Sequence, residues 1–149
     1  MTHPMGERVQ VGHLIYTVLE TQWLTQLGLG LSARVPQNRF FLVRLSVANS
    51  GSEALPAPAT TIEDDNGNSY SELTNGEGAP HWLGFLRQVK PAEAAMGNVM
   101  FDAPPRHYKL RVTDENESKS ALIDIPLTFS AEMPEPVEPG SDKLPAEKK

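Results

Sequence analysis

Apolar side chains recur at every second position in several stretches of the chain. The clearest stretches are residues 41–48, 108–113 and 121–127, and shorter ones are residues 9–11, 14–18 and 99–101. Alternate side chains of a β-strand point to opposite faces, so each stretch predicts a strand with one buried face. No stretch sustains the helical apolar period of about 3.6 residues, and the pattern therefore predicts an all-β protein.

Turn-forming residues separate these predicted strands. The run Asp65-Asn66-Gly67-Asn68 predicts a tight hairpin, because Asn-Gly tolerates the positive φ of a type I′ turn. Pro126 predicts that the last strand ends there or lies at a sheet edge, since proline has no N–H to donate to the ladder. Roughly seven short strands joined by frequent turns are typical of an antiparallel β-sandwich.

Three further segments carry structural information. Gly97 interrupts a strand pattern and predicts a bulge or the close approach of another backbone segment. Residues 26–37 mix leucine with glycine, and we expect them to link two strands across one end of the sandwich. Residues 114–117 are acidic, and we expect them to form a solvated loop.

The composition changes near residue 130. Residues 130–149 contain four of the 13 prolines, and their apolar side chains follow no period. Such a segment cannot bury enough apolar area to offset the entropy lost on ordering it. We therefore expect one sandwich domain over residues 7–129, followed by a disordered tail rich in proline, glutamate and lysine over residues 130–149.

Composition and charge remove several function classes. The chain has no cysteine, which excludes disulfides, thiolate zinc sites, iron–sulfur clusters and a cysteine nucleophile. Its net charge of -6 and pI near 5.2 argue against a nucleic-acid partner, which needs a basic surface. No apolar run approaches the ~20 residues that span a bilayer, so we expect no membrane span within the chain.

The order of several short motifs resembles a known bacterial family. The motifs are VQVG at 9–12, IYTVLET at 15–21, RFFLVRLSVANSGSEAL at 39–55, IEDDNGNSY at 62–70, VKPAE at 89–93, GNVMFDAPP at 97–105 and YKLRV at 108–112. Their order and spacing resemble the immunoprotective extracellular Ig-like family, whose domains of unknown function occur in exported antigens and lipoproteins. The resemblance covers nearly all of residues 7–127. It implies an immunoglobulin-like antiparallel β-sandwich with a binding role, and it supplies no catalytic residues.

The same resemblance bears on the compartment. Members of the family usually carry a signal peptide, often ending in a lipid-anchored cysteine, which implies an extracytoplasmic location. Residues 1–6 contain neither the basic segment nor the apolar segment of a signal peptide. Either the given chain lacks its targeting segment, or this member stays inside the cell.

An aromatic segment is the first candidate for a binding surface. It brings Trp82 and Phe85 together with Leu83 and Leu86 between two loop signals. An exposed apolar cluster of this kind docks protein partners. The alternative is a short turn or strand that folds back and buries the same side chains against the end of the sandwich.

One acidic turn offers a second candidate. Asp64, Asn66 and Asn68 have the oxygen atoms and the spacing of the first ligands in a Ca²⁺ loop. Ser69 and Asn75 then stand where such a loop has glycine and glutamate. A solvated hairpin explains the same residues, so a Ca²⁺-binding or small-ligand module is the alternative function.

Catalytic patterns are absent from the sequence. There is no Gly-x-Ser-x-Gly, and the four histidines have no spacing typical of a metal site. Residues 28–33 match a dinucleotide motif formally, but a strand follows where a helix is required. We therefore expect no enzyme activity and no cofactor, and we hypothesise a non-catalytic interaction module of the bacterial envelope or an exported protein that binds a protein partner.

Overall fold

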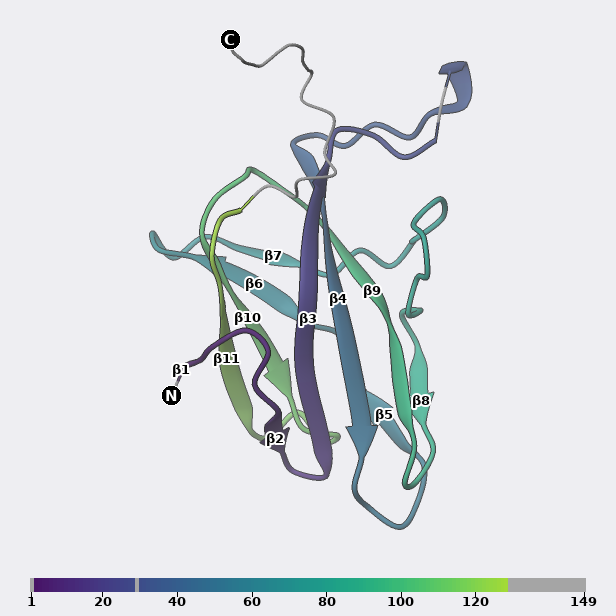
Figure 1. The fold of residues 1–149 in the computed structure, drawn as a ribbon, viewed down its shortest axis with the longest axis vertical. Helices are drawn as coiled ribbons and strands as arrows, with labels where there is room; N and C mark the ends of the chain where they lie inside the picture. Colours follow the sequence, from purple (N-terminus) through teal and green to yellow (C-terminus); the bar gives the residue numbers. More distant parts are fainter. Residues whose placement is uncertain (1, 29, 129–149) are drawn as a thin grey trace, which may run out of the picture.

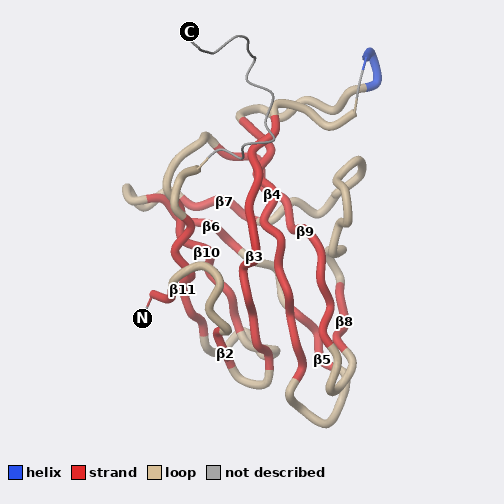
Figure 2. Tube along the Cα trace, in the orientation of Figure 1, coloured by secondary structure: helices blue, strands red, loops and turns tan. Residues whose placement is uncertain are grey.

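The chain folds into two packed β-sheets, and the computed structural model describes residues 2–28 and 30–128 (Figure 1). In chain order the strands are β1 (Thr2–His3), β2 (Val9–Val11), β3 (Leu14–Leu24), β4 (Arg39–Asn49), β5 (Leu55–Ala57), β6 (Thr61–Asp64), β7 (Ser69–Ser71), β8 (Arg87–Val89), β9 (Ala94–Ala103), β10 (Tyr108–Thr113) and β11 (Ser120–Ile125). One 3₁₀ turn, η1 (Gly30–Ser32), lies at the tip of a projecting loop (Figure 2). No helix among the described residues is long and apolar enough to cross a bilayer. The all-β sandwich predicted from the alternation is confirmed.

The two sheets face each other across a shared core. One sheet has five strands in the order β1–β11–β10–β6–β7, and the other has four in the order β2–β3–β4–β9. The two-stranded ribbon of β5 and β8 lies at the lower end of the sandwich (Figure 1). Neighbouring strands pair antiparallel except β1 and β11, where Thr2 and His3 run parallel to Leu122 and Ile123.

Aromatic side chains from both sheets form the centre of this core. Trp23 stacks on Phe41 with 4.1 Å between ring centroids, and each ring lies 6.1 Å from the Tyr108 ring. The positions of β4 and β10 that alternate as apolar in the sequence are the buried ones. Because the chain has no cysteine, burial of these large side chains and strand pairing must hold the two sheets together.

A smaller apolar cluster lies on the outer face of the four-stranded sheet. Leu27, Phe40, Leu42 and Met100 are buried there, although Phe40, Leu42 and Met100 alternate along β4 and β9 with the residues that face the main core. Leu24, Leu73 and Ala79 pack against this outer cluster. Two loops therefore cover this part of the sheet: the loop between β3 and β4, and the loop that follows β7.

Three short strands lie outside the predicted pattern. β1, β5 and β8 have the sequences TH, LPA and RQV, none of which places apolar residues on both sides of a polar one as β2 does. The five-stranded sheet therefore includes Thr2, ahead of the predicted domain start at residue 7. β11 ends at Ile125, directly before Pro126, as the proline predicted. The tail predicted over residues 130–149 lies outside the described residues.

Residues 26–37 link two strands at one end of the sandwich, as predicted, but the prediction that they cross that end is wrong. Leu24 in β3 pairs directly with Phe40 in β4, and the chain between these strands leaves the sheet as a projecting arm (Figure 1). Adjacent antiparallel strands leave no gap for a long connection to bridge, and the additional residues extend outward. A β-bridge between Leu27 and Arg34 closes this arm, whose described residues are 25–28 and 30–38.

Candidate functional site

The aromatic segment runs beside the free edge of β9. Trp82 forms a parallel bridge with Asn98, whose backbone N–H donates to the His81 carbonyl at 2.7 Å. The Leu83 N–H donates in turn to the Asn98 carbonyl at 2.9 Å. Gly97 permits this approach, because a Cβ there would lie 2.6 Å from the His81 carbonyl oxygen. The close backbone approach predicted at Gly97 is confirmed.

The four residues of the predicted binding surface separate into two groups. The Trp82 indole packs against Gly76 and keeps 36% of its surface exposed, while Leu83 is half-buried against the main core. The chain then turns at Gly84, so that Phe85 is half-buried and Leu86 is 93% exposed. Trp82 and Leu83 thus tie the segment to the sandwich, and Phe85 and Leu86 face a different surface.

Phe85 and Leu86 line a groove that the sequence pattern did not reveal. The groove has a volume of about 430 Å³ and its lining residues are Pro56, Ala57, Pro58, Ala59, Phe85, Leu86, Arg87, Gln88 and Glu117. One wall is β5 with Pro58 and Ala59 after it, and the other is formed by Phe85 and Leu86 with the first two residues of β8. The run Leu55-Pro-Ala-Pro-Ala was the available sequence signal, since alternate prolines favour an extended chain. We call this site the β5–β8 groove.

A buried ion pair fixes the floor of the β5–β8 groove. Arg87 binds Glu72 through two parallel bonds, with Nη1–Oε2 at 2.6 Å and Nη2–Oε1 at 3.0 Å, and both side chains are almost fully buried. The same guanidinium donates to the Gly84 carbonyl at 2.7 Å and to the Pro58 carbonyl at 2.9 Å. Thr60 donates its N–H and its hydroxyl to Glu72. Arg87 therefore joins the two walls of the groove.

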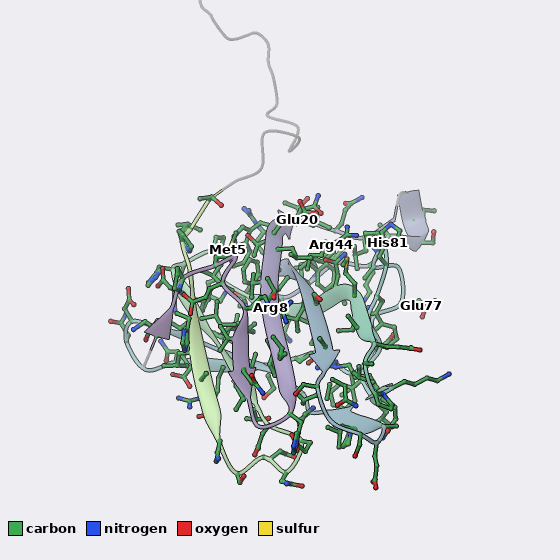
Figure 3. All side chains as sticks on the ribbon, turned by 60° about the horizontal axis from the view of Figure 1, so that its bottom comes forward. Met5, Arg8, Glu20, Arg44, Glu77 and His81 are labelled. Carbon is green, nitrogen blue, oxygen red and sulfur yellow. The ribbon has the colours of Figure 1, made fainter. Side chains whose placement is uncertain are left out.

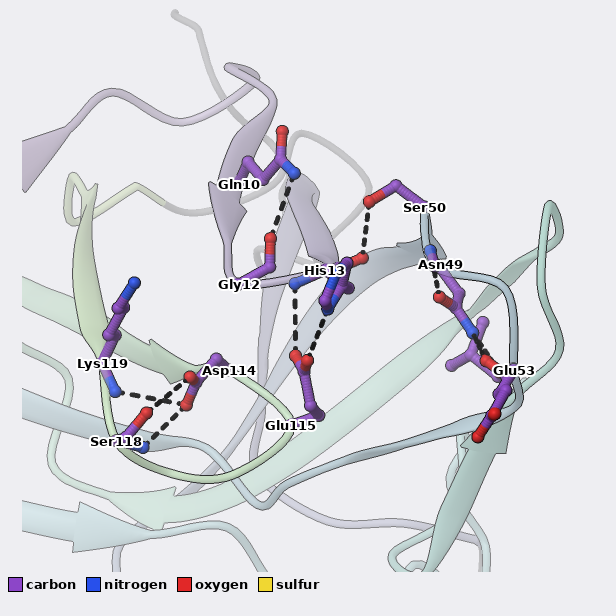
Figure 4. A network of polar contacts seen from close by, with 12 residues as sticks. Gln10, Gly12, His13, Asn49, Ser50, Glu53, Asp114, Glu115, Ser118 and Lys119 are labelled. Atoms are coloured by element: carbon purple, nitrogen blue, oxygen red, sulfur yellow. Dashed lines mark hydrogen bonds and ion pairs between the residues drawn. The ribbon is translucent and has the colours of Figure 1, made fainter.

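A polar network orders the loops at the same end of the sandwich (Figure 4). Glu115 accepts a bond from the His13 backbone N–H, and its second oxygen lies 2.7 Å from His13 Nδ1. Asp114 is buried and accepts the Ser118 N–H and hydroxyl at 2.7 Å each, and the hydroxyl bond is the main cause that lowers the pKa of Asp114. The predicted solvated loop is therefore wrong for Asp114, which caps the turn that carries Glu117 to the groove.

In the acidic turn proposed as a Ca²⁺ site, the Asp64 carboxylate already accepts hydrogen bonds from N–H donors of the protein. The Asp64 carboxylate accepts the backbone N–H groups of Asn66 and Asn68 and the Asn68 side-chain amide at 2.9 Å each, and Arg106 Nη1 at 2.8 Å. These bonds, the Asn68 side-chain bond first, lower the pKa of Asp64 to about 2. A Ca²⁺ ion would have to displace the Arg106 guanidinium, and no three His, Asp or Glu side chains gather as a metal site within residues 2–28 and 30–128. Ca²⁺ binding here stays a prediction without further support.

His107 connects this turn to the neighbouring strand. Its Nε2 lies 2.6 Å from Asp124 Oδ1, and its Nδ1 lies 3.0 Å from Asp65 Oδ1. The hydrogen bond with Asp124 is the main cause that raises the pKa of His107 above its usual value of 6.5, and Asp65 adds to it. The His107 imidazole therefore joins β11 to the β6–β7 turn.

The His107 contacts predict a pH dependence of stability. Because the pKa of His107 is higher in the folded state, its stabilisation is fully present below pH 6.5 and is lost as the pH rises through the folded pKa. Between pH 6 and pH 9, we expect the free energy of unfolding to fall further in the wild type than in His107→Gln. The additional fall is expected to be below about 1 kcal/mol. Urea unfolding at several pH values measures the difference, and identical pH profiles would contradict the assigned contacts.

The outer face of the four-stranded sheet carries mixed side chains outside the covered cluster. Glu20 and Arg44 lie near each other on this face (Figure 3), with 3.7 Å between Oε2 and Nη1. Arg44 also reaches the sulfur of the exposed Met96 at 3.8 Å. This charged surface lacks the apolar residues that predominate in the lining of the β5–β8 groove, which is therefore the stronger candidate site.

Solved structures with the same fold come from bacteria. The yjhA protein from Bacillus subtilis has a TM-score of 0.63 at 16% identity, covering 83% of this chain and 98% of that one. A secreted protein from Mycobacterium tuberculosis, MPT63, has a TM-score of 0.60 at 13% identity, covering 84% and 97%. The putative lipoprotein ycdA from Bacillus subtilis has a TM-score of 0.60 at 15% identity, covering 80% of this chain and 38% of that one. These likenesses show the shared fold.

A family match extends over most of the sandwich. No curated protein matches the chain. Residues 3–121 match DUF4352, a domain of unknown function, and this range spans every strand from β2 to β10. The predicted membership of a family of bacterial β-sandwich domains without assigned function is confirmed. The chain belongs to the DUF4352 family.

Proposed function

We propose that the chain is a non-catalytic interaction domain that binds an extended, apolar segment of a protein partner in the β5–β8 groove. The observation that carries this proposal is the exposure of Leu86 beside the half-buried Phe85, in a groove that Pro56 of β5 and Pro58 also line. When a partner covers a side chain as apolar as leucine, the free energy of binding becomes more favourable. The groove volume of about 430 Å³ lies within the usual range for small binding sites.

The chemistry of the walls favours recognition through side chains. Pro56 has no N–H, so this part of β5 cannot extend its sheet by accepting a full additional strand. Aromatic and proline surfaces instead bind extended segments, above all segments with a proline-rich conformation, by apolar contact. The bonds from Arg87 to both walls hold the groove in shape before the partner arrives, which reduces the entropy lost on binding.

The groove lining also supports a non-catalytic function. Among the described residues that line it, the titratable side chains are Arg87 and Glu117. Arg87 forms an ion pair with Glu72. The other lining residues include no nucleophile beside Glu117. General acid–base chemistry needs a base within hydrogen-bond distance of a reacting group, and this pair of side chains does not supply one.

An envelope or exported location is part of the proposal. The similar solved structures include one described as a secreted protein and one described as a putative lipoprotein. A stable sandwich without cysteine is compatible with an oxidising compartment, since it contains no thiol to react. The partner would then be another protein of the envelope or of the extracellular space.

Replacing Leu86 with glutamate tests the proposed function. Peptides selected from a random displayed library on the wild-type domain are expected to be apolar and rich in proline. Their Kd, measured by fluorescence polarisation, is expected to rise at least about tenfold for Leu86→Glu, because a charge then stands in an apolar contact. Leu86 is so exposed that the melting temperature is expected to stay unchanged.

The matched control is Leu31→Glu, which makes the same change at an exposed leucine on the arm. This variant is expected to bind the selected peptides like the wild type. Selected peptides that bind Leu86→Glu as tightly as the wild type, or a selection that enriches no peptide, would contradict the assignment of the groove.

A further inference from the structure

The arm projects from the end of the sandwich opposite the β5–β8 groove (Figure 1). Two backbone hydrogen bonds close it, from the Leu27 N–H to the Arg34 carbonyl at 2.9 Å and from the Arg34 N–H to the Leu27 carbonyl at 2.7 Å. Beyond this bridge, Gly30 adopts a φ of +70° and begins the single 3₁₀ turn at the tip. The arm is therefore a paired stem that carries a tight loop.

The stem is fixed to the sandwich at its base. Leu27 is buried in the outer cluster beside Phe40. The Arg34 guanidinium carbon lies 5.2 Å from the centre of the Phe40 ring, and its Nη1 donates to the Glu77 carbonyl at 2.9 Å. Packing, a cation–π contact and a hydrogen bond thus set the direction in which the tip points.

The arm carries exposed aliphatic side chains at its tip and on its stem, and cations at its stem and base. Leu31 is fully exposed and Val35 is largely exposed. In a chain of net charge -6, residues 21–52 contain no aspartate or glutamate, whereas Arg34 and Arg39 lie within the arm and at its base. Neither arginine belongs to an ion pair among the described residues. The arm is locally basic and apolar on an otherwise acidic domain.

The Asp102 carboxylate lies at the base of the arm. Asp102 in β9 accepts the backbone N–H groups of Gln37 and Asn38 at 2.8 Å each. These two bonds hold the negative charge against the stem, where backbone donors compensate part of it. The two arginines of the stem and base therefore stand beside a carboxylate whose charge is already partly compensated.

We propose that the arm docks the domain onto the surface of an anionic phospholipid bilayer. Leu31 and Val35 insert among the upper parts of the acyl chains, and Arg34 and Arg39 bind headgroup phosphates. Apolar side chains flanked by cations are the composition that binds an anionic membrane surface, and the attraction falls with added salt. Arg34 has further N–H donors beyond the one that Glu77 accepts, so it can bind a phosphate without leaving the stem.

The shape of the tip favours a bilayer over a protein partner. A stable protein interface covers roughly 800 Å² on each side and requires matching surfaces, whereas Leu31 at the tip and Val35 on the stem offer only a narrow convex point. A fluid bilayer accepts such a point without a preformed pocket. The opposite end of the sandwich, with the β5–β8 groove, would then face away from the membrane.

Vesicle binding by the full chain tests the proposal. We expect the wild type to co-sediment with vesicles that contain phosphatidylglycerol, and to bind vesicles of phosphatidylcholine alone at least about fivefold more weakly. Leu31→Glu is expected to reduce binding to the anionic vesicles at least about tenfold, since it removes the inserted group and adds a repelled charge. Leu31→Trp is expected to keep binding and to show a blue shift of fluorescence when vesicles are added.

Leu86→Glu is the matched control, because it alters an equally exposed leucine at the other end of the molecule. It is expected to bind anionic vesicles like the wild type, and Leu31→Glu is expected to bind the selected peptides like the wild type. Failure of the membrane proposal is thus separable from failure of the groove proposal. Three outcomes would each overturn the membrane proposal: the wild type does not bind anionic vesicles, Leu31→Glu binds them as well as the wild type, or the emission of Leu31→Trp does not change when vesicles are added.

Discussion

Replacing Glu72 with glutamine is expected to lower the free energy of unfolding by about 3–5 kcal/mol. Glutamine can still accept the bonds from Thr60, but the Arg87 guanidinium is left buried without an anion. A buried charge without a partner costs far more than a lost surface contact. Guanidinium-induced unfolding, followed by tryptophan fluorescence, measures this loss.

The control for this variant is Glu63→Gln, which breaks the more exposed pair of Glu63 and Arg111 at 2.6 Å. Exposed pairs contribute about 0–1 kcal/mol, so a small loss is expected. A Glu72→Gln protein as stable as Glu63→Gln would contradict the importance assigned to the buried pair.

A double variant separates the two consequences of the buried pair. Glu72→Leu/Arg87→Met removes both charges, and we expect it to recover most of the stability lost in Glu72→Gln. It is expected not to recover peptide binding, because the Gly84 and Pro58 carbonyls lose the guanidinium that joins the groove walls. The pair is thus more important for the shape of the groove than for the net stability of the sandwich.

Replacing Gly97 with valine is expected to cost about 1–3 kcal/mol and to displace the aromatic segment from β9. The new Cβ would lie 2.6 Å from the His81 carbonyl oxygen and 3.0 Å from the Leu83 nitrogen, and both are backbone atoms that cannot rotate away. Trp82 would then leave its place against Gly76. Its fluorescence is expected to shift to the red and to become more accessible to acrylamide, while Trp23 stays buried.

Met96→Val serves as the control, because Met96 is an exposed neighbour on the same strand. Its stability is expected to change by no more than about 0.5 kcal/mol, with unchanged fluorescence. Unchanged acrylamide quenching in Gly97→Val would show that the segment tolerates the side chain, contrary to the geometry.

The long strands could be predicted because each of them buries one face. Strands such as β4 and β10 need apolar residues at every second position, and this alternation is visible within each short stretch of the sequence. Gly97 was equally informative, since a glycine inside a strand is costly unless another backbone needs the space. The arm was misjudged because its leucines and glycines have the composition of a linker, whereas Leu27 and Phe40 pack it against the outer face of the sheet.

The β5–β8 groove could not be predicted from a local sequence pattern, because it forms through contacts between residues that are distant in the sequence. β5 and β8 are three residues long, and they pair only because the loops after β4 and β7 bring them together. Glu72 and Arg87 look like two surface charges in the sequence, although folding buries them as a pair. Of the predicted site residues, Phe85 and Leu86 reach the groove, while Trp82 and Leu83 attach their segment to β9.

The parallel pairing of β1 with β11 constrains the order of events during synthesis. Thr2 leaves the ribosome before the rest of the sandwich, and its partner Leu122 is among the last residues of the sandwich to do so. The edge of the five-stranded sheet therefore stays open until almost the whole domain has emerged, and an open edge can pair with a second nascent chain. Contacts between such distant residues also slow folding, so the β1–β11 pair is expected to form late. Until it forms, a low local concentration of the chain is expected to limit pairing with a second copy.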